Sequence, residues 1–189
     1  MRKAIVLAGL LFAWAASVAS AGPIPEYRVI AGAYIPTGSQ RDFLKSSMVL
    51  GIQGGLEATD MLHFVATVMY ATPRPKDTSI TNDVHIYQYD AGAELFHVYT
   101  VSKTDDHLSF RPFLGAGAGA RSYHLQNTDL KSQTDFTGYG SLGAELQHKN
   151  VAARLEVRDY MTRFNGFQGE LAAKTYWSLV VGGGFSYHF

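Results

Sequence analysis

The sequence predicts an all-β fold, an eight-stranded antiparallel up-and-down transmembrane β-barrel that follows a cleaved signal peptide. Three observations predict it. Segments of alternating apolar and polar residues recur along the chain, the connections between them alternate between long and short, and aromatic residues gather at both ends of the apolar face. These patterns favour a barrel that closes on itself, because an open sheet with an aromatic edge strand would aggregate.

The composition is that of a folded protein with a single domain. The chain has 189 residues, of which 47% are hydrophobic, 13% aromatic and 17% charged. It contains no cysteine, which excludes disulfides, thiolate metal sites and a cysteine nucleophile. Basic and acidic residues number 16 each, and a signal peptide that takes Arg2 and Lys3 with it would leave a net charge of −2. This balance gives no reason to expect nucleic acid as a partner.

The first 21 residues have the three regions of a secretory signal. Met1 to Lys3 form a basic start, residues 4–18 form an apolar run, and Ala19-Ser20-Ala21 is a small-residue cleavage site. Because the apolar run is shorter than the ~20 residues of a spanning helix, we expect cleavage after Ala21 rather than retention as an anchor. The predicted units are a signal peptide over 1–21 and a barrel over 22–189.

Eight segments with a period of two are predicted as strands. Most reach the ~9 to 11 residues that a tilted membrane strand needs. They span about 27–35, 46–57, 62–71, 84–97, 109–123, 136–148, 151–161 and 176–189.

The connections between these segments differ in length. Odd-numbered connections are long and polar, whereas even-numbered ones are generally shorter. Short turns on one rim and long loops on the other are typical of an outer-membrane barrel, whose turns face the periplasm. The long connections are 36–45, 72–83, 124–135 and 162–175, and the short ones are 58–61, 100–108 and 149–150.

The residues on the two faces of the strands indicate whether water or lipid surrounds the barrel. One face is apolar, and the opposite face holds most of the strand charges. A soluble lipocalin-like barrel would turn the apolar face inward, and alternation alone fits that arrangement equally well. The aromatic residues favour a bilayer, because they form two belts at the heights of the headgroups. Tyr27, Tyr187 and Phe189 fall at the short-turn ends, and Tyr70, Tyr87, Tyr89, Phe136 and Trp177 at or near the long-loop ends.

An interior charge network is predicted from the charged face. An eight-stranded barrel is wide enough only for its own side chains, so these charges are expected to pair across the lumen. Inward glycines on two strands leave room for bulky neighbours. The network residues are Arg28, Asp90, Glu94, Arg111, Arg121, Glu145, Arg154, Glu156 and Arg158, and the glycines are Gly115, Gly117, Gly119, Gly182 and Gly184.

The two-residue turn at Lys149-Asn150 predicts a register for the two strands beside it. Opposed positions sum to 299, which places Glu145 opposite Arg154 inside the barrel. Directly opposed residues have Cβ atoms about 5 Å apart, close enough for an ion pair. Gly143 lies beside the pair and is expected to leave space for Glu156 or Arg158.

Three stretches carry a resemblance to a known family. They are Arg111-Pro-Phe-Leu-Gly-Ala-Gly-Ala-Gly-Ala120, Ala153-Arg-Leu-Glu-Val-Arg-Asp-Tyr160 and the terminal Phe185-Ser-Tyr-His-Phe189. With them, residues 27–189 resemble the small outer-membrane β-barrels that include the OmpA transmembrane domain and OmpX-type proteins. The resemblance implies the outer membrane of a Gram-negative bacterium, with outer-membrane lipids and lipopolysaccharide as partners. It also implies that Phe185, Tyr187 and Phe189 form the signal read by the barrel-assembly machinery.

The candidate chemistry is sparse. The seven histidines lack zinc-type spacing, so neither a metal site nor a cofactor is expected. The expected function is therefore a structural or surface-interaction role without catalysis, and no loop motif names an extracellular ligand. One alternative is an enzyme that hydrolyses or transfers acyl chains of lipid A, with Ser122 as nucleophile, His124 as base and Asp129 as its orienter. A soluble lipocalin-like binder is the third possibility.

Overall fold

The structure, a computed structural model, describes residues 24–76, 84–101, 108–125, 133–164 and 174–188. The predicted signal peptide, Asp129 and Phe189 lie outside these residues. Eight long strands form the fold, and a two-residue strand, β5, is added at one end. The strands are β1 (Ile24–Thr37), β2 (Ser47–Thr59), β3 (Leu62–Ala71), β4 (Val84–Phe96), β5 (Tyr99–Thr100), β6 (Leu108–Leu125), β7 (Gln133–His148), β8 (Val151–Phe164) and β9 (Lys174–His188).

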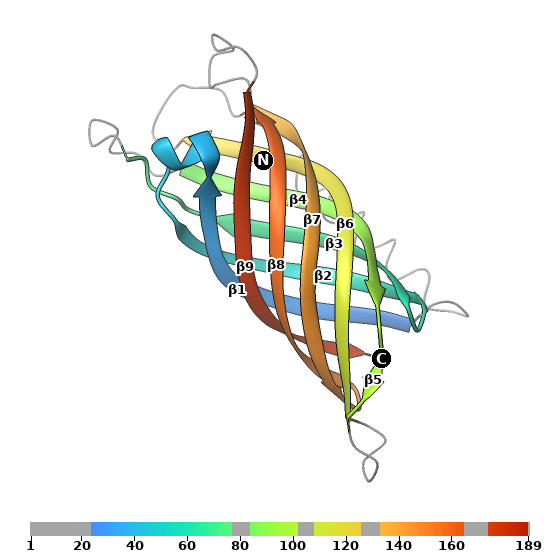
Figure 1. Cartoon of the computed structure of the whole chain (residues 1–189). Helices are drawn as coiled ribbons and strands as arrows, with labels where there is room; N and C mark the ends of the chain where they lie inside the picture. Colours follow the sequence, from blue (N-terminus) through green and yellow to red (C-terminus); the bar gives the residue numbers. More distant parts are fainter. Residues whose placement is uncertain (1–23, 77–83, 102–107, 126–132, 165–173, 189) are drawn as a thin grey trace.

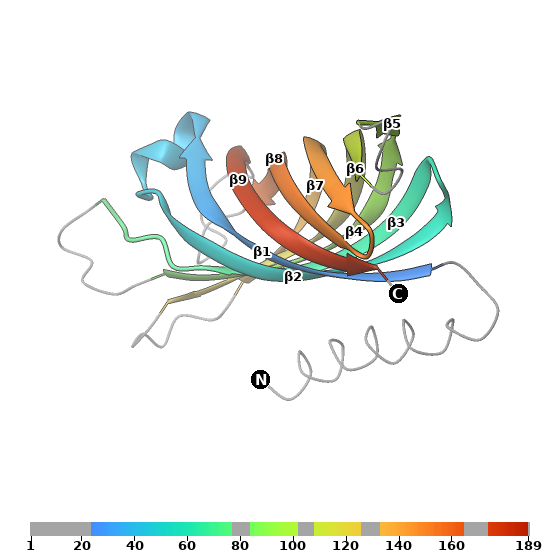
Figure 2. The same ribbon diagram turned by 90° about the horizontal axis from the view of Figure 1, so that it is seen from below.

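The long strands close into one antiparallel barrel. Each pairs with its neighbours in sequence, and β1 also pairs with β9, while β4 pairs directly with β6. Figures 1 and 2 show the tilted strands curving around a single interior. Closure leaves no open edge of unpaired backbone groups among the long strands. The predicted eight-stranded up-and-down barrel is therefore confirmed.

The register predicted for the β7–β8 hairpin is the observed one. Glu145 lies opposite Arg154, and Leu142 lies opposite Val157. At the turn, Lys149 has a positive φ of 53°, as tight hairpin turns require. The Asn150 side chain donates a hydrogen bond of 2.7 Å to the carbonyl oxygen of His188. The hairpin is thereby tied to the end of β9.

Several strands are longer than predicted. The strand β1 begins earlier, at Ile24. The strand β6 ends later, at Leu125, and β7 begins earlier, at Gln133, so both reach into the connection 124–135 that was predicted as a long loop. These extensions carry polar residues. The alternation of apolar and polar residues is lost where a strand passes beyond the apolar band of the barrel. A short 3-10 helix, η1 (Gly38–Asp42), also lies in the first long connection and was not predicted. Within the described residues, no helix is long and apolar enough to cross a membrane.

Burial alternates along the strands with the apolar side chains outward. From Val151 to Arg163, the residues of β8 are alternately exposed and buried. Leu155 and Phe185 are 73% and 72% exposed, although both are large and hydrophobic. Two charges are exposed on the otherwise apolar outer face of β8, Asp159 within the predicted strand and Arg163 beyond its predicted end. The assignment of the apolar face to the outside otherwise agrees with the described strands.

Candidate functional site

The barrel interior has two zones. Charged and polar side chains fill the half toward the short turns. Apolar and aromatic side chains fill the half toward the long loops, although only the charged zone was identified in the sequence. The apolar zone could have been found from alternation, because its residues continue the inward-facing positions of the same strands; Tyr160, for example, lies two positions after Arg158. Its buried members are Tyr34, Val49, Met69, Ala71, Val84, Ile86, Tyr123, Tyr139, Tyr160 and Val180.

Arg154 is the centre of the charged zone. Its guanidinium donates to Glu145 at 2.6 Å, to Glu94 at 2.6 and 3.0 Å, and to Glu156 at 2.9 Å. The guanidinium carbon also lies 3.6 Å from the centre of the Phe113 ring. All four ionic side chains are at least nine-tenths buried. Arg154 therefore links β8 both to neighbouring β7 and to β4, which is not its neighbour.

A second arginine extends this network toward the long loops. Arg158 donates through Nε to Glu156, and its Nη1 lies 3.1 Å from both Asp90 and Thr67. The hydroxyl of Tyr160 donates to the other oxygen of Asp90 at 2.8 Å. Both oxygens of the Asp90 carboxylate are thus bonded, as a buried charge requires.

Arg28 extends the network toward the short turns. It donates to Glu26 at 2.5 Å and to Glu145 at 2.8 Å, and its other terminal nitrogen bonds Gln53. Glu26 is 2% exposed, but it precedes the first predicted strand and was missed. Its position two residues before Arg28 places it on the same face, which is the signal that identifies it.

Arg111 lies near the short-turn rim, in a group with His63, whose Nδ1 is 3.9 Å from Glu26. It donates to Gln147 at 2.7 Å and to Nε2 of His63 at 3.0 Å, and it lies 3.6 Å from Glu57. The guanidinium also lies over the Phe96 ring at 4.8 Å.

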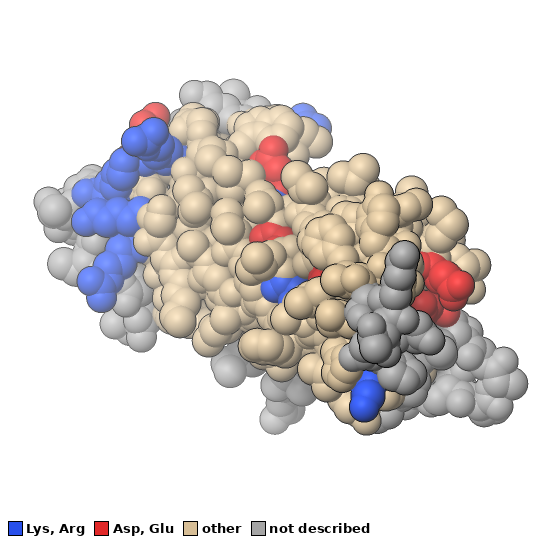
Figure 3. All heavy atoms as spheres, turned by 60° about the horizontal axis from the view of Figure 1, so that its bottom comes forward, with Lys and Arg blue, Asp and Glu red and all other residues tan. Residues whose placement is uncertain are grey.

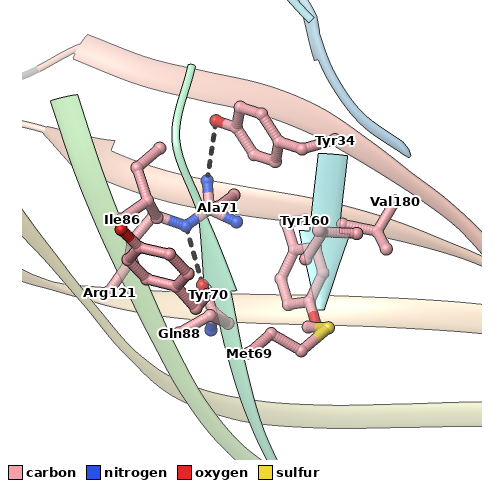
Figure 4. Close-up of a pocket in the computed structure, with 10 residues that line it drawn as sticks. Tyr34, Met69, Tyr70, Ala71, Ile86, Gln88, Arg121, Tyr160 and Val180 are labelled. Carbon is pink, nitrogen blue, oxygen red and sulfur yellow. Dashed lines mark hydrogen bonds between the residues drawn. The ribbon is translucent and has the colours of Figure 1, made fainter. Parts of the chain in front are cut away.

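Arg121 lies in the apolar zone, apart from the other predicted network residues (Figure 4). Its guanidinium donates to Gln88 at 2.7 Å, to Ser178 at 2.9 Å and to the Tyr34 hydroxyl at 3.5 Å. It also lies 5.1 Å from the centre of the Tyr160 ring. The cavity beside it measures about 10 Å³, the lower limit for one water molecule.

Two carboxylates and a histidine come close enough to suggest a cation site. Glu26, Glu145 and His188 place one possible ligand atom each within 4.8 Å of one another. Arg28 donates to both of these carboxylates, at 2.5 and 2.8 Å. A protein cation therefore already stands between the two carboxylates, and we propose no metal there.

The inward glycines allow a close approach of neighbouring backbone and, at two positions, of aromatic rings; a Cβ on Gly119 or Gly184 would collide with a carbonyl oxygen of the paired strand. A Cβ on Gly117 would lie 2.5 Å from the Tyr139 ring, and one on Gly143 would lie 2.5 Å from the Phe113 ring. Glu156 joins the pair of Glu145 and Arg154 as predicted, since Arg154 donates to it at 2.9 Å, but Gly143 does not provide the space. The ring of Phe113 takes that space, and Arg154 stacks on it.

The predicted catalytic residues are only partly brought together. Ser122 and His124 both lie on the outer face of β6, but the Ser122 hydroxyl is 2.8 Å from that of Thr134. The His124 ring meets the edge of Tyr87 with centroids 5.6 Å apart. A triad requires the base within hydrogen-bond reach of the nucleophile. Because Asp129 lies outside the described residues, catalysis here stays a prediction.

The aromatic residues predicted to form belts point outward in the described strands. At the short-turn end, Tyr27 lies directly opposite Tyr187. At the long-loop end, Tyr70 lies opposite Tyr87 with ring centroids 5.1 Å apart. The strand residues of the predicted assembly signal, Phe185 and Tyr187, are likewise exposed.

The pairing of Glu145 with Arg154 gives a direct test of the interior network. Arg154→Met should destabilise the barrel by about 3 to 5 kcal/mol, because it leaves buried carboxylates without their cationic partner. Glu145→Gln should cost less, since Arg28 and Arg154 keep other carboxylate partners. Urea unfolding in lipid vesicles of both single variants and the double variant measures the coupling.

The matched control is Arg163→Met, an exposed position on the same strand. It should change the free energy of unfolding by no more than about 0.5 kcal/mol. A coupling energy between Glu145 and Arg154 below about 0.5 kcal/mol would contradict the ion pair.

Comparisons with known proteins address the fold. No family model matches the sequence, and no curated protein matches it. Among solved structures, Neisserial surface protein A is similar, with a TM-score of 0.65 and 16% identity over 87% of this chain and 97% of that one. The outer membrane protein OprG from Pseudomonas aeruginosa matches with a TM-score of 0.56 and 14% identity, over 89% and 97% of the two chains.

A third similar structure is the N-terminal β-barrel domain of Pseudomonas aeruginosa OprF. It has a TM-score of 0.50 and 14% identity, over 87% of this chain and 97% of that one. Identities this low establish shared architecture rather than a shared activity. The chain therefore has the fold of the small outer-membrane β-barrels.

Proposed function

We propose that the chain is an integral outer-membrane protein of a Gram-negative bacterium with a structural or surface-interaction role and without enzymatic activity. In this proposal its long loops face the cell exterior, and the charged side chains close its lumen. Outer-membrane lipids and lipopolysaccharide surround it.

The apolar outer face supports a membrane environment. Large hydrophobic side chains on different strands are more than 60% exposed, among them Leu114, Leu155 and Phe185. An apolar surface of this extent is unfavourable in water and typical of contact with a partner or lipid. A soluble lipocalin-like barrel needs the reverse arrangement, with apolar side chains inside.

Hydrogen bonds that the arginines make across the barrel support the proposal of a closed lumen. Arg154 on β8 bonds Glu94 on β4, and Arg28 on β1 bonds Glu145 on β7. Neither strand pair is adjacent in the sheet. Side chains that meet from non-adjacent strands occupy the space through which ions would have to pass.

Conductance in planar bilayers tests this proposal. The refolded wild-type barrel should show little conductance, because its side chains fill the lumen. The double variant Arg154→Ala/Arg158→Ala removes two guanidiniums from the network and should raise the conductance. Large, stable single-channel steps from the wild type at neutral pH would contradict a closed lumen. Arg163→Ala, exposed on the same strand, is the control, and circular dichroism verifies folding of each variant.

The absence of enzymatic activity is tested on lipid A. The geometry around Ser122 favours a structural role, because its hydroxyl is bonded to Thr134. Lipid A from cells with and without the gene should have the same acyl composition. Loss or transfer of an acyl chain that depends on Ser122 would establish the enzyme instead.

We also propose that Phe185, Tyr187 and Phe189 form the signal for the barrel-assembly machinery. Phe185 is 72% and Tyr187 48% exposed, so both side chains are accessible on the finished strand. Deleting Phe189 should lower insertion into the outer membrane of cells and leave refolding in detergent nearly unchanged. Phe136→Ala, an exposed aromatic at the other rim, is the control. Equal insertion of wild type and deletion would remove the recognition role.

A further inference from the structure

An open hollow lies on the outer surface of the barrel beside the β7–β8 turn. It measures about 530 Å³, and its walls come from β7, β8 and β9 together with the turn. We call it the turn trough. Its apolar walls are formed by Leu146, Val151, Ala153 and Phe185, and its polar end includes Lys149 and Asn150.

The strand register produces the trough. Ala153 on β8 lies between Leu146 on β7 and Phe185 on β9, because it is paired directly with both. All three side chains point outward and are exposed. A single methyl group between two large side chains leaves a depression over β8, whose sides are the leucine and the phenylalanine ring. Val151 lies two positions nearer the turn and points to the same side.

The β7–β8 turn places a cation at the end of the trough. The side-chain amide of Gln147 donates a hydrogen bond of 3.0 Å to the carbonyl oxygen of Lys149, and Asn150 is bonded to the His188 carbonyl. These bonds fix the turn backbone from which the lysine side chain extends. Lys149 is exposed, and no carboxylate among the described residues forms an ion pair with its ammonium. The ammonium is therefore available to an anion from outside the chain.

The trough lies at the boundary between the apolar surface and the short-turn rim. The outer surface between the two ends of the barrel is largely without charge (Figure 3). Tyr187, which lies opposite Val151, belongs to the aromatic belt of the short-turn end, and such belts lie at the headgroup level of a bilayer. Along the chain, Ala153 and Lys149 lie on opposite sides of Val151. In the proposed orientation, on which this inference rests, the trough therefore faces acyl chains of the periplasmic leaflet, and Lys149 faces its headgroups.

The shape and the charge of the trough select the ligand together. Apolar contact alone selects none, because lipid tails are as apolar as the side chains that they touch. Shape does select, since atoms that line an unfilled depression lose dispersion contacts that a fitted chain restores. A phosphate adds a charge-assisted contact with the lysine ammonium. The ligand that meets both conditions has an apolar chain joined to an anionic phosphate headgroup.

A second copy of the chain fits the trough less well than a lipid. Two barrels in one membrane that met symmetrically at this surface would share a two-fold axis along the membrane normal. Each Lys149 would then approach its counterpart at the same depth, and like charges that face each other across an interface are unfavourable. A phospholipid brings the opposite charge to the same place.

We propose that the turn trough binds one glycerophospholipid of the periplasmic leaflet. An acyl chain lies over Ala153, between Leu146 and Phe185, and the phosphate lies at the Lys149 ammonium. The bound lipid thereby contacts β7, β8 and β9 at once, beside the strand that closes the barrel.

Native mass spectrometry of the refolded mature chain, released from detergent micelles and titrated with phosphatidylglycerol, measures stoichiometry and affinity. The wild type should retain one molecule. Lys149→Gln should lower the affinity about tenfold, because it removes one charge-assisted contact. Ala153→Leu should lower it to a similar extent, because the larger side chain fills the depression. Diacylglycerol with the same chains has no phosphate, and the wild type should bind it as weakly as Lys149→Gln binds phosphatidylglycerol.

Two matched controls change the same properties away from the trough. Ala116→Leu adds the same bulk at an exposed alanine on the outer face of β6, and Arg163→Gln removes an exposed cation at the long-loop end of β8. Both should keep the affinity of the wild type. Equal circular dichroism spectra verify that all variants fold.

Equal affinity of the wild type and either trough variant would overturn the proposal, as would equal retention of phosphatidylglycerol and diacylglycerol. The same spectra report the oligomeric state. A dimer of the wild type that is lost in Ala153→Leu would assign the trough to a second copy of the chain and overturn the lipid site.

Membrane fractionation separates this inference from the proposed function. If the protein fractionates with outer membranes and a trough variant binds phosphatidylglycerol like the wild type, the trough proposal fails and the proposed function stands. If the wild type is absent from outer membranes, the proposed function fails whatever the binding result.

Discussion

The burial of five arginines inside a narrow barrel is the constraint on which the rest of the structure depends. A guanidinium shielded from bulk water is strongly unfavourable unless acceptors surround it. Arg154 meets this condition with carboxylates from three strands, and Arg28 with carboxylates from two. Because these partners come from different strands, the network can form only if closure and register are both correct. The charges therefore specify one arrangement of the barrel as well as filling it.

The division of the interior into two zones follows from the same constraint. Carboxylates and arginines that bond the same partners must lie at similar positions along the barrel axis. In this barrel those positions are toward the short turns. Toward the long loops many of the buried side chains are apolar or aromatic, and Arg121, the one arginine there among the described residues, is bonded by neutral groups such as Gln88 and Ser178. Aromatic rings join the zones, since Tyr160 contacts Arg121 and bonds Asp90. Glycines such as Gly117 provide the space for such rings.

The sequence was sufficient to predict the strands, their faces and the β7–β8 register. Period-two alternation determines the face, and the turn at Lys149-Asn150 determines which residues oppose each other. Alternation does not determine which inward residues meet across the lumen, because that depends on the stagger of the closed sheet. For this reason the bond between Arg154 and Glu94 could not be predicted. The pairing of the first two long connections at Leu44 and Pro75 also left no alternation signal, because it involves a single bridge.

The central claim is that the barrel stands in lipid with its charged face inward. Spin labelling of single cysteines tests it most directly, and the chain has no native cysteine to remove. In lipid vesicles, labels at Ala153, Leu155 and Val157 should show high accessibility to dissolved oxygen, because these positions face outward on β8. Labels at the buried Ala152 and Thr162 should show low accessibility. A uniform profile along β8, or one with the two sets reversed, would contradict the account.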